Sequence, residues 1–148
     1  MNGYLLDTNA ISLFSPLKVS PDPAFTRWVE EQDRLDAIYL SVITVHEIEK
    51  GIRLLEYRGA TARAQTIQGW LNGLIAGYGE KILPVDNDVA LASGRLEAAA
   101  NAAGHGPGAA DAMIAGTAQV HGLTIITHNL RHFEPFSVAA ESPQQIAP

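Results

Sequence analysis

The chain has 148 residues, of which 47% are hydrophobic, so it is long enough to bury one core as a single domain over residues 1–148. Its formal net charge of −6 argues against a protein that coats nucleic acid through charge alone. It does not exclude an enzyme that acts on nucleic acid, because an acidic site that holds a metal ion itself contributes negative charge. There is no cysteine, which excludes disulfides and thiolate metal sites, and no apolar run reaches the length of about 18 residues that spans a membrane. With no signal-like N-terminus either, we expect a cytoplasmic protein.

The first half of the chain alternates short apolar runs with amphipathic segments. "GYLLD" predicts a strand that ends at Asp7, and Thr8 and Asn9 suit the start of the next helix. Beyond a proline-rich loop, apolar residues recur at helical spacing. The expected elements are a strand over 3–7, helices over 9–14 and 24–32, a strand over 38–40, a helix that Ser41 or Thr44 caps and Gly59 ends, and a helix over 61–78.

The same alternation continues in the second half. The expected elements are a strand in 81–86, a helix from Asp86 or Asp88 to Ala103, a loop over 103–108, a helix over 109–121 and a strand over 123–127. Residues 136–139 are a candidate fifth strand, and we expect the tail from about residue 142 to fray. The pattern predicts an α/β fold, with a mostly parallel sheet of four or five strands covered on both faces.

Small residues mark two of these helices. Gly69, Gly73 and Gly77 recur every four residues, which indicates close helix packing or an intrinsically weak helix rather than a membrane dimer motif. The helix over 109–121 is rich in alanine and glycine, so it can approach a neighbouring helix closely.

Polar residues follow two of the expected strands at the point where each strand ends. Asp7 follows the first strand, and Thr127 and Asn129 follow the strand over 123–127. Ligands of parallel α/β sheets bind beyond the carboxyl ends of the strands, so we expect a site at this edge. A simpler role for Asp7 is that of a helix cap.

Asp111 is a carboxylate on an apolar helix face. It shares that face with Ile114, Ala115 and Ala118, where an ionised group is costly to bury without a partner. A position in the first helical turn favours an anion, so a capping or dipole-pairing role is one interpretation. The other interpretation is a metal ligand, because a bound cation would offset the burial cost.

Glu47 and Glu49 flank an apolar stripe, and their neighbours distinguish them. Glu49 has Arg53 four residues on, which predicts a surface ion pair, whereas Glu47 lies among small or apolar residues. Glu47 is therefore the one expected to face inward. Together with Asp7 and Asp111 it would supply the oxygen ligands that Mg²⁺ or Mn²⁺ prefers, and no thiols or paired histidines favour zinc.

Four segments, in this order, resemble the ordered blocks of PIN-domain ribonucleases. They are "LLDTN", "SVITVHEIEKGI", "ADAMIAGTA" and "LTIITHNLRHFE", within a resemblance that runs from about residue 3 to residue 138. The closest likeness is to the VapC and FitB type of toxin from bacterial toxin–antitoxin pairs. This resemblance implies a small PIN-like α/β/α sandwich and a Mg²⁺-dependent endoribonuclease, with Mn²⁺ as a possible substitute.

The resemblance also implies roles for the carboxylates. Asp7, Glu47 and Asp111 match the first three acidic positions of the family. Asp7 and Asp111 would bind the ion directly, and Glu47 would bind it or orient its water. The implied reaction is hydrolysis of an RNA phosphodiester bond by a metal-activated water.

Departures from the family pattern concern the fourth block. Asn129 stands where some relatives have a fourth aspartate, and His128 stands where the family often has arginine. We assign Asn129 a catalytic role as a neutral oxygen ligand or water holder. Asn9 and Thr127 would orient the ligands and water.

The resemblance further implies a homodimer, an RNA substrate and a cognate antitoxin of the VapB or FitA kind. The protein would contact DNA only indirectly, through this antitoxin. An alternative, motivated by Asn129 and the acidic charge, is a catalytically weak or dead PIN-like module that binds antitoxin or RNA without cutting. A phosphatase of the haloacid-dehalogenase type also places an aspartate after its first strand. That chemistry wants a second aspartate two residues on, where this chain has Asn9.

Overall fold

Five parallel strands form the centre of the protein, in the order β3-β2-β1-β4-β5. A computed structural model describes residues 3–148. The strands are β1 (Gly3–Leu6), β2 (Ile38–Ser41), β3 (Ile82–Leu83), β4 (Leu123–Ile126) and β5 (Ala140–Glu141). The α-helices are α1 (Thr8–Ser12), α2 (Pro23–Arg34), α3 (Val42–Tyr57), α4 (Thr61–Tyr78), α5 (Asn87–Ala102), α6 (Ala109–His121), α7 (Leu130–Phe133) and α8 (Pro143–Ile146). This is the predicted α/β fold of the PIN-like kind.

β1 is the central strand, and the chain changes direction around it. The chain builds outward from β1 to β2 and β3, then crosses to the other side of β1 to form β4 and β5. Leu5 pairs with Tyr39 of β2 and with Ile125 of β4. The carboxyl ends of β1 and β4 therefore adjoin at a topological switch point, where α/β sheets bind ligands.

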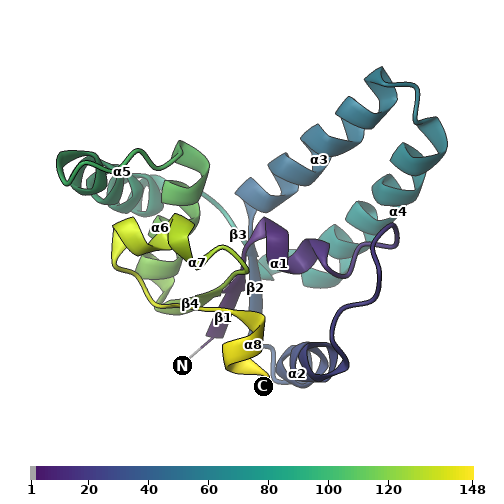
Figure 1. Ribbon diagram of the computed structural model, residues 1–148, viewed down its shortest axis with the longest axis horizontal. Helices are drawn as coiled ribbons and strands as arrows, with labels where there is room; N and C mark the ends of the chain where they lie inside the picture. The colour runs from purple at the N-terminus through teal and green to yellow at the C-terminus, as the bar shows by residue number, and fades with distance from the viewer. Residues whose placement is uncertain (1–2) are drawn as a thin grey trace.

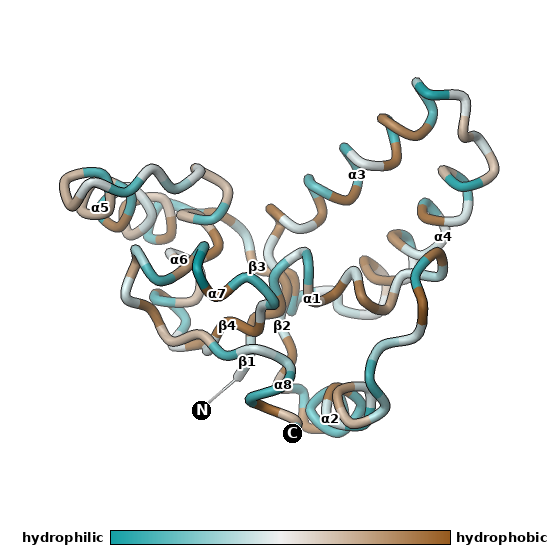
Figure 2. Tube along the Cα trace, viewed as in Figure 1, coloured by the Kyte–Doolittle hydropathy of each residue, from teal (hydrophilic) through white to brown (hydrophobic). Residues whose placement is uncertain are grey.

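Successive strand residues face opposite layers, which gives the molecule two cores (Figure 1). Leu6 and Ile126 belong to a core with α1 to α4, whereas Leu5 and Ile125 belong to a core with α5, α6 and α7. Figure 2 shows hydrophobic residues along the central strands and recurring at intervals along helices such as α3 and α4. The α/β/α layering that the sequence predicts follows from this alternation.

Two helical hairpins of different build flank the sheet. The α3–α4 hairpin projects away from the sheet, whereas α5 and α6 lie together on its other side (Figure 1). A Cβ atom added to Gly116 of α6 would lie 2.9 Å from the Ser93 nitrogen and 3.0 Å from the Val89 carbonyl oxygen of α5. Close packing of the alanine- and glycine-rich helix, as expected from its composition, is thus confirmed.

The glycines of α4 behave differently. Within residues 3–148, no atom outside the local helix lies within 4 Å of a Cβ built on Gly69, Gly73 or Gly77. The interpretation of close helix packing at these glycines is therefore wrong, and an intrinsically weak helix stays a prediction.

The C-terminal segment differs from the prediction in two places. The fifth strand is Ala140–Glu141 rather than 136–139, because Pro135 favours a 3₁₀ turn over Glu134–Phe136 and Phe136 packs into the core. The tail expected to fray from residue 142 instead forms α8. Ser142 and Gln145 make a capping box at its start, and Ile146 packs against the core of α1 to α4.

The structure also settles the two open helix starts. Ser41 caps α3 by accepting the N–H of Ile43, and Asp86 caps α5 by accepting the N–H of Val89. Across residues 3–148, no helix combines the length and the apolar character needed to cross a membrane.

Candidate active site

Asp7 ends β1 and caps α1 at the same time. Its Oδ1 accepts the backbone N–H of Ala10 at 2.8 Å, and its Oδ2 accepts the hydroxyl of Thr127 at 2.5 Å. Only 4% of Asp7 is exposed. The capping role considered for Asp7 is therefore confirmed, but a cap needs only one carboxylate oxygen and does not require burial. The second oxygen, Oδ2, links the end of β1 to Thr127 at the end of β4.

Thr127 connects Asp7 to the segment after β4. Its Oγ1 donates to Asp7 and accepts the backbone N–H of Asn129 at 2.9 Å. Asn129 thus supports the site through its main chain, as the residue preceding α7. This fixes the orientation of the Thr127 hydroxyl, because its single hydrogen points at the Asp7 carboxylate.

Glu47 is held by the residue that follows Asp7. Oγ1 of Thr8 lies 2.6 Å from Oε1 of Glu47 and 3.1 Å from Oγ1 of the fully buried Thr44. Since a hydroxyl has one hydrogen, Thr8 donates to the carboxylate, and the Thr44 hydroxyl is left to donate to Thr8. Glu49 pairs with Arg53 at 3.2 Å on the surface, so the predicted distinction between the two glutamates is confirmed.

Asp111 lies in the first turn of α6 and is half-buried. Its Oδ2 is 3.4 Å from Nδ1 of the exposed His132 on α7. By contrast, Asn9 is exposed on α1, and no hydrogen bond among residues 3–148 joins its side chain to the three carboxylates. Its orienting role stays a prediction.

The three carboxylates interact electrostatically. Burial raises the pKa of Asp7 above its ordinary value, the bonds from Thr127 and Ala10 oppose this, and the charges of Asp111 and Glu47 raise the pKa further. Burial likewise raises the pKa of Asp111, with His132 lowering it and Glu47 raising it. Side chains from β1, α3 and α6 therefore share one region of concentrated negative charge.

The donor set fits a hard divalent cation in kind, since it is made of carboxylate oxygens. Among the residues that the structure describes, however, no three His, Asp or Glu side chains are arranged to hold an ion together. Each carboxylate is instead turned toward a hydrogen-bond or ion-pair partner: Asp7 toward Thr127, Glu47 toward Thr8 and Asp111 toward His132. Two carboxylates with several waters satisfy Mg²⁺, so the arrangement suits such an ion without closing around it.

Two hollows of different character open beside the carboxylates. A groove of about 310 Å³ runs from Thr8 and Glu47 along α3 and α4, lined with the apolar side chains of Ile52, Ile67 and Trp70. We call it the α3–α4 groove. On the opposite side, a hollow of about 360 Å³ adjoins Asp111 and is lined by the residues His105, Gly106, Pro107, Gly108, Arg131, His132 and Pro135. We call it the α7 hollow.

The strand order and the polar residues at the β1–β4 switch point place the chain among the parallel α/β domains that bind ligands at this edge of the sheet. The family model described as "PIN domain" matches residues 4–136, and the chain belongs to the PIN-domain family.

Individual proteins agree with this assignment. Toxin FitB of Neisseria gonorrhoeae is 34% identical over 94% of this chain and 96% of its own. VapC ribonuclease Y4jK of Sinorhizobium fredii is 33% identical over 97% and 99%. The solved structure of FitAcB from Neisseria gonorrhoeae superposes with a TM-score of 0.81 at 32% identity, covering 95% of this chain and 98% of that one. A solved structure of FitAB bound to a DNA fragment has a TM-score of 0.73 at 31% identity, covering 95% and 94%.

Sequence reasoning missed three contributions to the site. Thr8 holds Glu47, His132 faces Asp111, and Arg131 lines the α7 hollow. The position of Thr8 directly after Asp7 suggested only a helix start. His132 and Arg131 belong to a segment quoted for its family likeness, but nothing in their spacing relates them to residue 111.

Proposed function

We propose that this protein is a divalent-metal-dependent endoribonuclease, the toxin of a toxin–antitoxin pair, acting on RNA in the cytoplasm. The observation that supports this proposal is that, in a PIN domain, Asp7 ends β1 beside β4, the next residue Thr8 bonds to Glu47, and the charges of Glu47 and Asp111 act on Asp7. The names of its relatives, a FitB toxin and a VapC ribonuclease, support the same activity.

Asp7 and Asp111 would hold the ion, Mg²⁺ or Mn²⁺, and Glu47 would bind it or a water beside it. Such an ion supplies Lewis-acid activation of water and offsets negative charge on the reacting phosphodiester. Thr127 and Thr8 keep the carboxylates in place through hydrogen bonds of 2.5 and 2.6 Å. The buried position of Asp7 limits the access of bulk water to that ligand. Asn129 holds Thr127 in place through its backbone N–H. We propose that the side chain of Asn129 contacts the water.

The test is cleavage of a mixed pool of structured RNAs with Mg²⁺, with Mn²⁺ and with EDTA. Asp7→Asn should reduce cutting by more than the roughly 10–100-fold that follows loss of a residue that merely supports a ligand. Asp22→Asn is the matched control, since Asp22 is exposed and caps α2 by accepting the Ala24 N–H at 2.8 Å, and no hydrogen bond among residues 3–148 joins it to the three carboxylates. Full activity of Asp7→Asn with an intact fold would refute the proposed ligand.

The antitoxin is proposed to bind along the α3–α4 groove. An apolar segment would fill the groove, and a basic side chain would then meet the carboxylates at the end formed by Thr8 and Glu47. The DNA contact would belong to the antitoxin. The homodimer implied by the resemblance stays a prediction, which sedimentation velocity would check.

Gly51 offers a way to block this groove without removing a contact. It is exposed in the groove lining, and a Cβ there meets no atom within 4 Å. Gly51→Leu should therefore weaken the antitoxin complex while sparing RNA cleavage. Gly73→Leu, at an equally open position outside the groove lining, is the control. Equal antitoxin affinities for both variants, measured by calorimetry, would place the partner elsewhere.

A nuclease-dead binding module is the second candidate, because no three side chains close around an ion in residues 3–148. It predicts that the purified protein binds antitoxin or RNA, but that no RNA is cut with either metal. Metal-dependent cutting that Asp7→Asn abolishes would eliminate it.

A further inference from the structure

Arg131 stands on the side of the site away from the α3–α4 groove. It lies on the short helix α7, two residues beyond Asn129, and lines the α7 hollow together with His105, His132 and Asp111. One proposed metal ligand, Asp111, thus forms part of the wall of this hollow. Whatever occupies the hollow lies next to the reacting centre.

Arg131 also borders a second hollow. This space of about 500 Å³ is lined by residues of the segment from His128 to Glu134. Arg131 and His132 line both spaces, so the two hollows adjoin at α7. A ligand in either hollow therefore lies beside Arg131.

The charge of Arg131 is not used within the fold. The ion pairs formed within residues 3–148 engage Arg34, Arg53, Lys81 and His132, but not Arg131. Glu134 is the acidic residue of the second hollow, and no ion pair joins it to Arg131. A guanidinium that is exposed, free of an ion pair and beside a nuclease-like site suits a phosphate group, which it can bind through two parallel N–H bonds.

The lining of the α7 hollow favours nucleic acid over a protein tail. Apart from Pro107 and Pro135, it is built from glycine, histidine, arginine and aspartate, without the large aliphatic and aromatic side chains that line the α3–α4 groove. Gly106 and Gly108 carry no side chain to cover their backbone amides, and a Cβ at either position would meet no atom within 4 Å. Such walls offer hydrogen-bond donors to phosphate and ribose but little apolar area to bury.

We propose that the α7 hollow binds the backbone of the RNA strand beside the scissile phosphate, with Arg131 contacting a neighbouring phosphate. This inference rests on the proposed ribonuclease function, because it assigns the same substrate to a further surface. Arg131 is a positioning residue in this scheme. The substrate strand lies on the Asp111 side of the site, and the Glu47 side is left for the antitoxin.

Binding measured in EDTA tests the site independently of cleavage. The probe is a short fluorescein-labelled single-stranded RNA of mixed sequence, followed by fluorescence anisotropy at several salt concentrations. Arg131→Ala should weaken binding several-fold and make the slope of log K against log salt shallower by about 0.7, the value for one phosphate contact on a single strand. Arg131→Lys should recover part of the affinity, since it keeps the charge but not the fork geometry.

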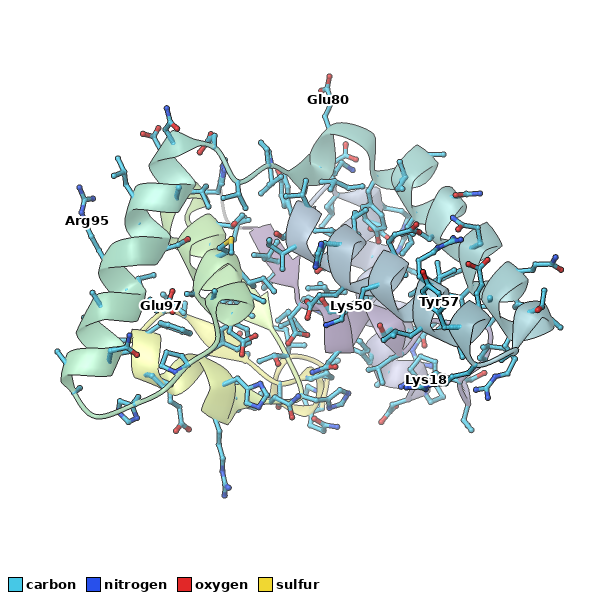
Figure 3. The ribbon with its side chains drawn as sticks, turned by 90° about the horizontal axis from the view of Figure 1, so that it is seen from above. Lys18, Lys50, Tyr57, Glu80, Arg95 and Glu97 are labelled. Atoms are coloured by element: carbon cyan, nitrogen blue, oxygen red, sulfur yellow. The ribbon has the colours of Figure 1, made fainter. Side chains whose placement is uncertain are left out.

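Arg95→Ala is the matched control. Arg95 is an exposed arginine of α5 that points away from the body of the molecule (Figure 3). It should bind RNA as the unmodified protein does. If Arg131→Ala and Arg95→Ala bind equally well, or if the unmodified protein binds no RNA, the proposed hollow is wrong. Thermal melting of both variants checks that each remains folded.

Cleavage kinetics then separate this inference from the proposed function. Arg131→Ala should raise KM more than it lowers kcat. If the unmodified protein cuts RNA and Arg131→Ala has the same KM, the ribonuclease function stands and the proposed RNA site in the α7 hollow is wrong. If RNA binding depends on Arg131 but no RNA is cut, the proposed RNA site stands and the proposed ribonuclease function is wrong. Weakened antitoxin binding with unchanged RNA binding would assign Arg131 to the protein partner instead.

Discussion

The two helical hairpins beside the sheet each supply one carboxylate, but they hold it in different ways. In the α3–α4 hairpin, Glu47 is held by a hydrogen bond from Thr8, and the helices leave an apolar groove between them and α1. In the α5–α6 hairpin, Asp111 lies on a helix that packs closely at Gly116, and its Oδ2 is 3.4 Å from Nδ1 of the exposed His132. A carboxylate can thus be fixed by a specific donor or by the rigidity of its helix.

Glycines in the two hairpins therefore have opposite surroundings. Gly69, Gly73 and Gly77 repeat regularly, yet within residues 3–148 a Cβ built on any of them meets no atom within 4 Å, whereas Gly116 has no such repeat and lies against the backbone of α5. An open hairpin keeps a groove that a partner can enter, and a closed one keeps a ligand in position. The difference lies in what faces each glycine, which the periodicity of one helix does not reveal.

The largest expected effect comes from a methyl group added to each hairpin. Gly116→Ala should destabilise the protein by about 1–3 kcal/mol, because the new Cβ would press on the backbone of α5, which cannot move aside easily. Gly73→Ala should instead stabilise it by about 0.5–1 kcal/mol, because alanine suits a helix interior better than glycine and the site is open. Urea unfolding monitored by circular dichroism measures both.

Cleavage assays extend this comparison. Gly116→Ala should also lose activity, since the strain falls on the helix that carries Asp111, whereas Gly73→Ala should not. A stability gain in both variants would mean that the two hairpins are equally open.

The next effect concerns the donor that fixes Glu47. Thr8→Val removes the hydroxyl while keeping the shape of the side chain, and should lower cleavage by roughly 10–100-fold, as for other residues that orient a ligand. Thr66→Val on α4 is the control, since the Thr66 hydroxyl bonds only to the Ala62 carbonyl of its own helix. By comparison, His132→Gln should lower the free energy of unfolding by no more than about 1 kcal/mol, because an exposed ion pair contributes little to stability. Steady-state rates that fall equally for Thr8→Val and Thr66→Val would remove the special role of Thr8.

Local patterns were enough to predict the layers of the fold and the strand ends that carry Asp7 and Thr127. Helical bounds such as Thr61–Tyr78 and Ala109–His121 were correct because glycines flank both helices in the sequence, with Gly79 and Gly122 directly after their last residues. The fifth strand was misplaced because Phe136 and Val138 alternate like strand residues, while Pro135 starts a 3₁₀ turn. In the tail, the capping box of Ser142 was the overlooked signal.

The site was less predictable than the fold, because its contacts join distant segments. Thr8 and Glu47 are 39 residues apart and Asp7 and Thr127 are 120 apart, so no periodicity relates them. The resemblance to PIN domains named the carboxylates, but gave no indication that Asn129 contacts Thr127 through its main chain. Convergence of such residues depends on strand order and helix crossing, which are properties of the whole fold.

A further expected effect is a pH dependence of stability at Asp7, on which the charges of both Glu47 and Asp111 act. Burial raises its pKa above the ordinary value of 3.8, so the folded protein holds this proton more tightly than the unfolded chain. The stabilisation is therefore fully present below about pH 3.8 and is lost as the pH rises through the folded pKa. Asp7→Asn cannot ionise. Its stability relative to the unmodified protein should accordingly increase as the pH rises above about 3.8, by about 1.4 kcal/mol for each unit by which the folded pKa is raised, and thermal melting across this range measures it.

A divalent ion should reverse this difference. Mn²⁺ at neutral pH should raise the melting temperature of the unmodified protein, because it binds the ionised carboxylates of the folded state, and should leave Asp7→Asn nearly unchanged. Asp22→Asn, which alters an exposed cap of the same kind, should behave as the unmodified protein in both experiments. If the pH dependence of Asp7→Asn matches that of Asp22→Asn, the Asp7 charge is not costly in the fold, and a cation is not needed to offset it.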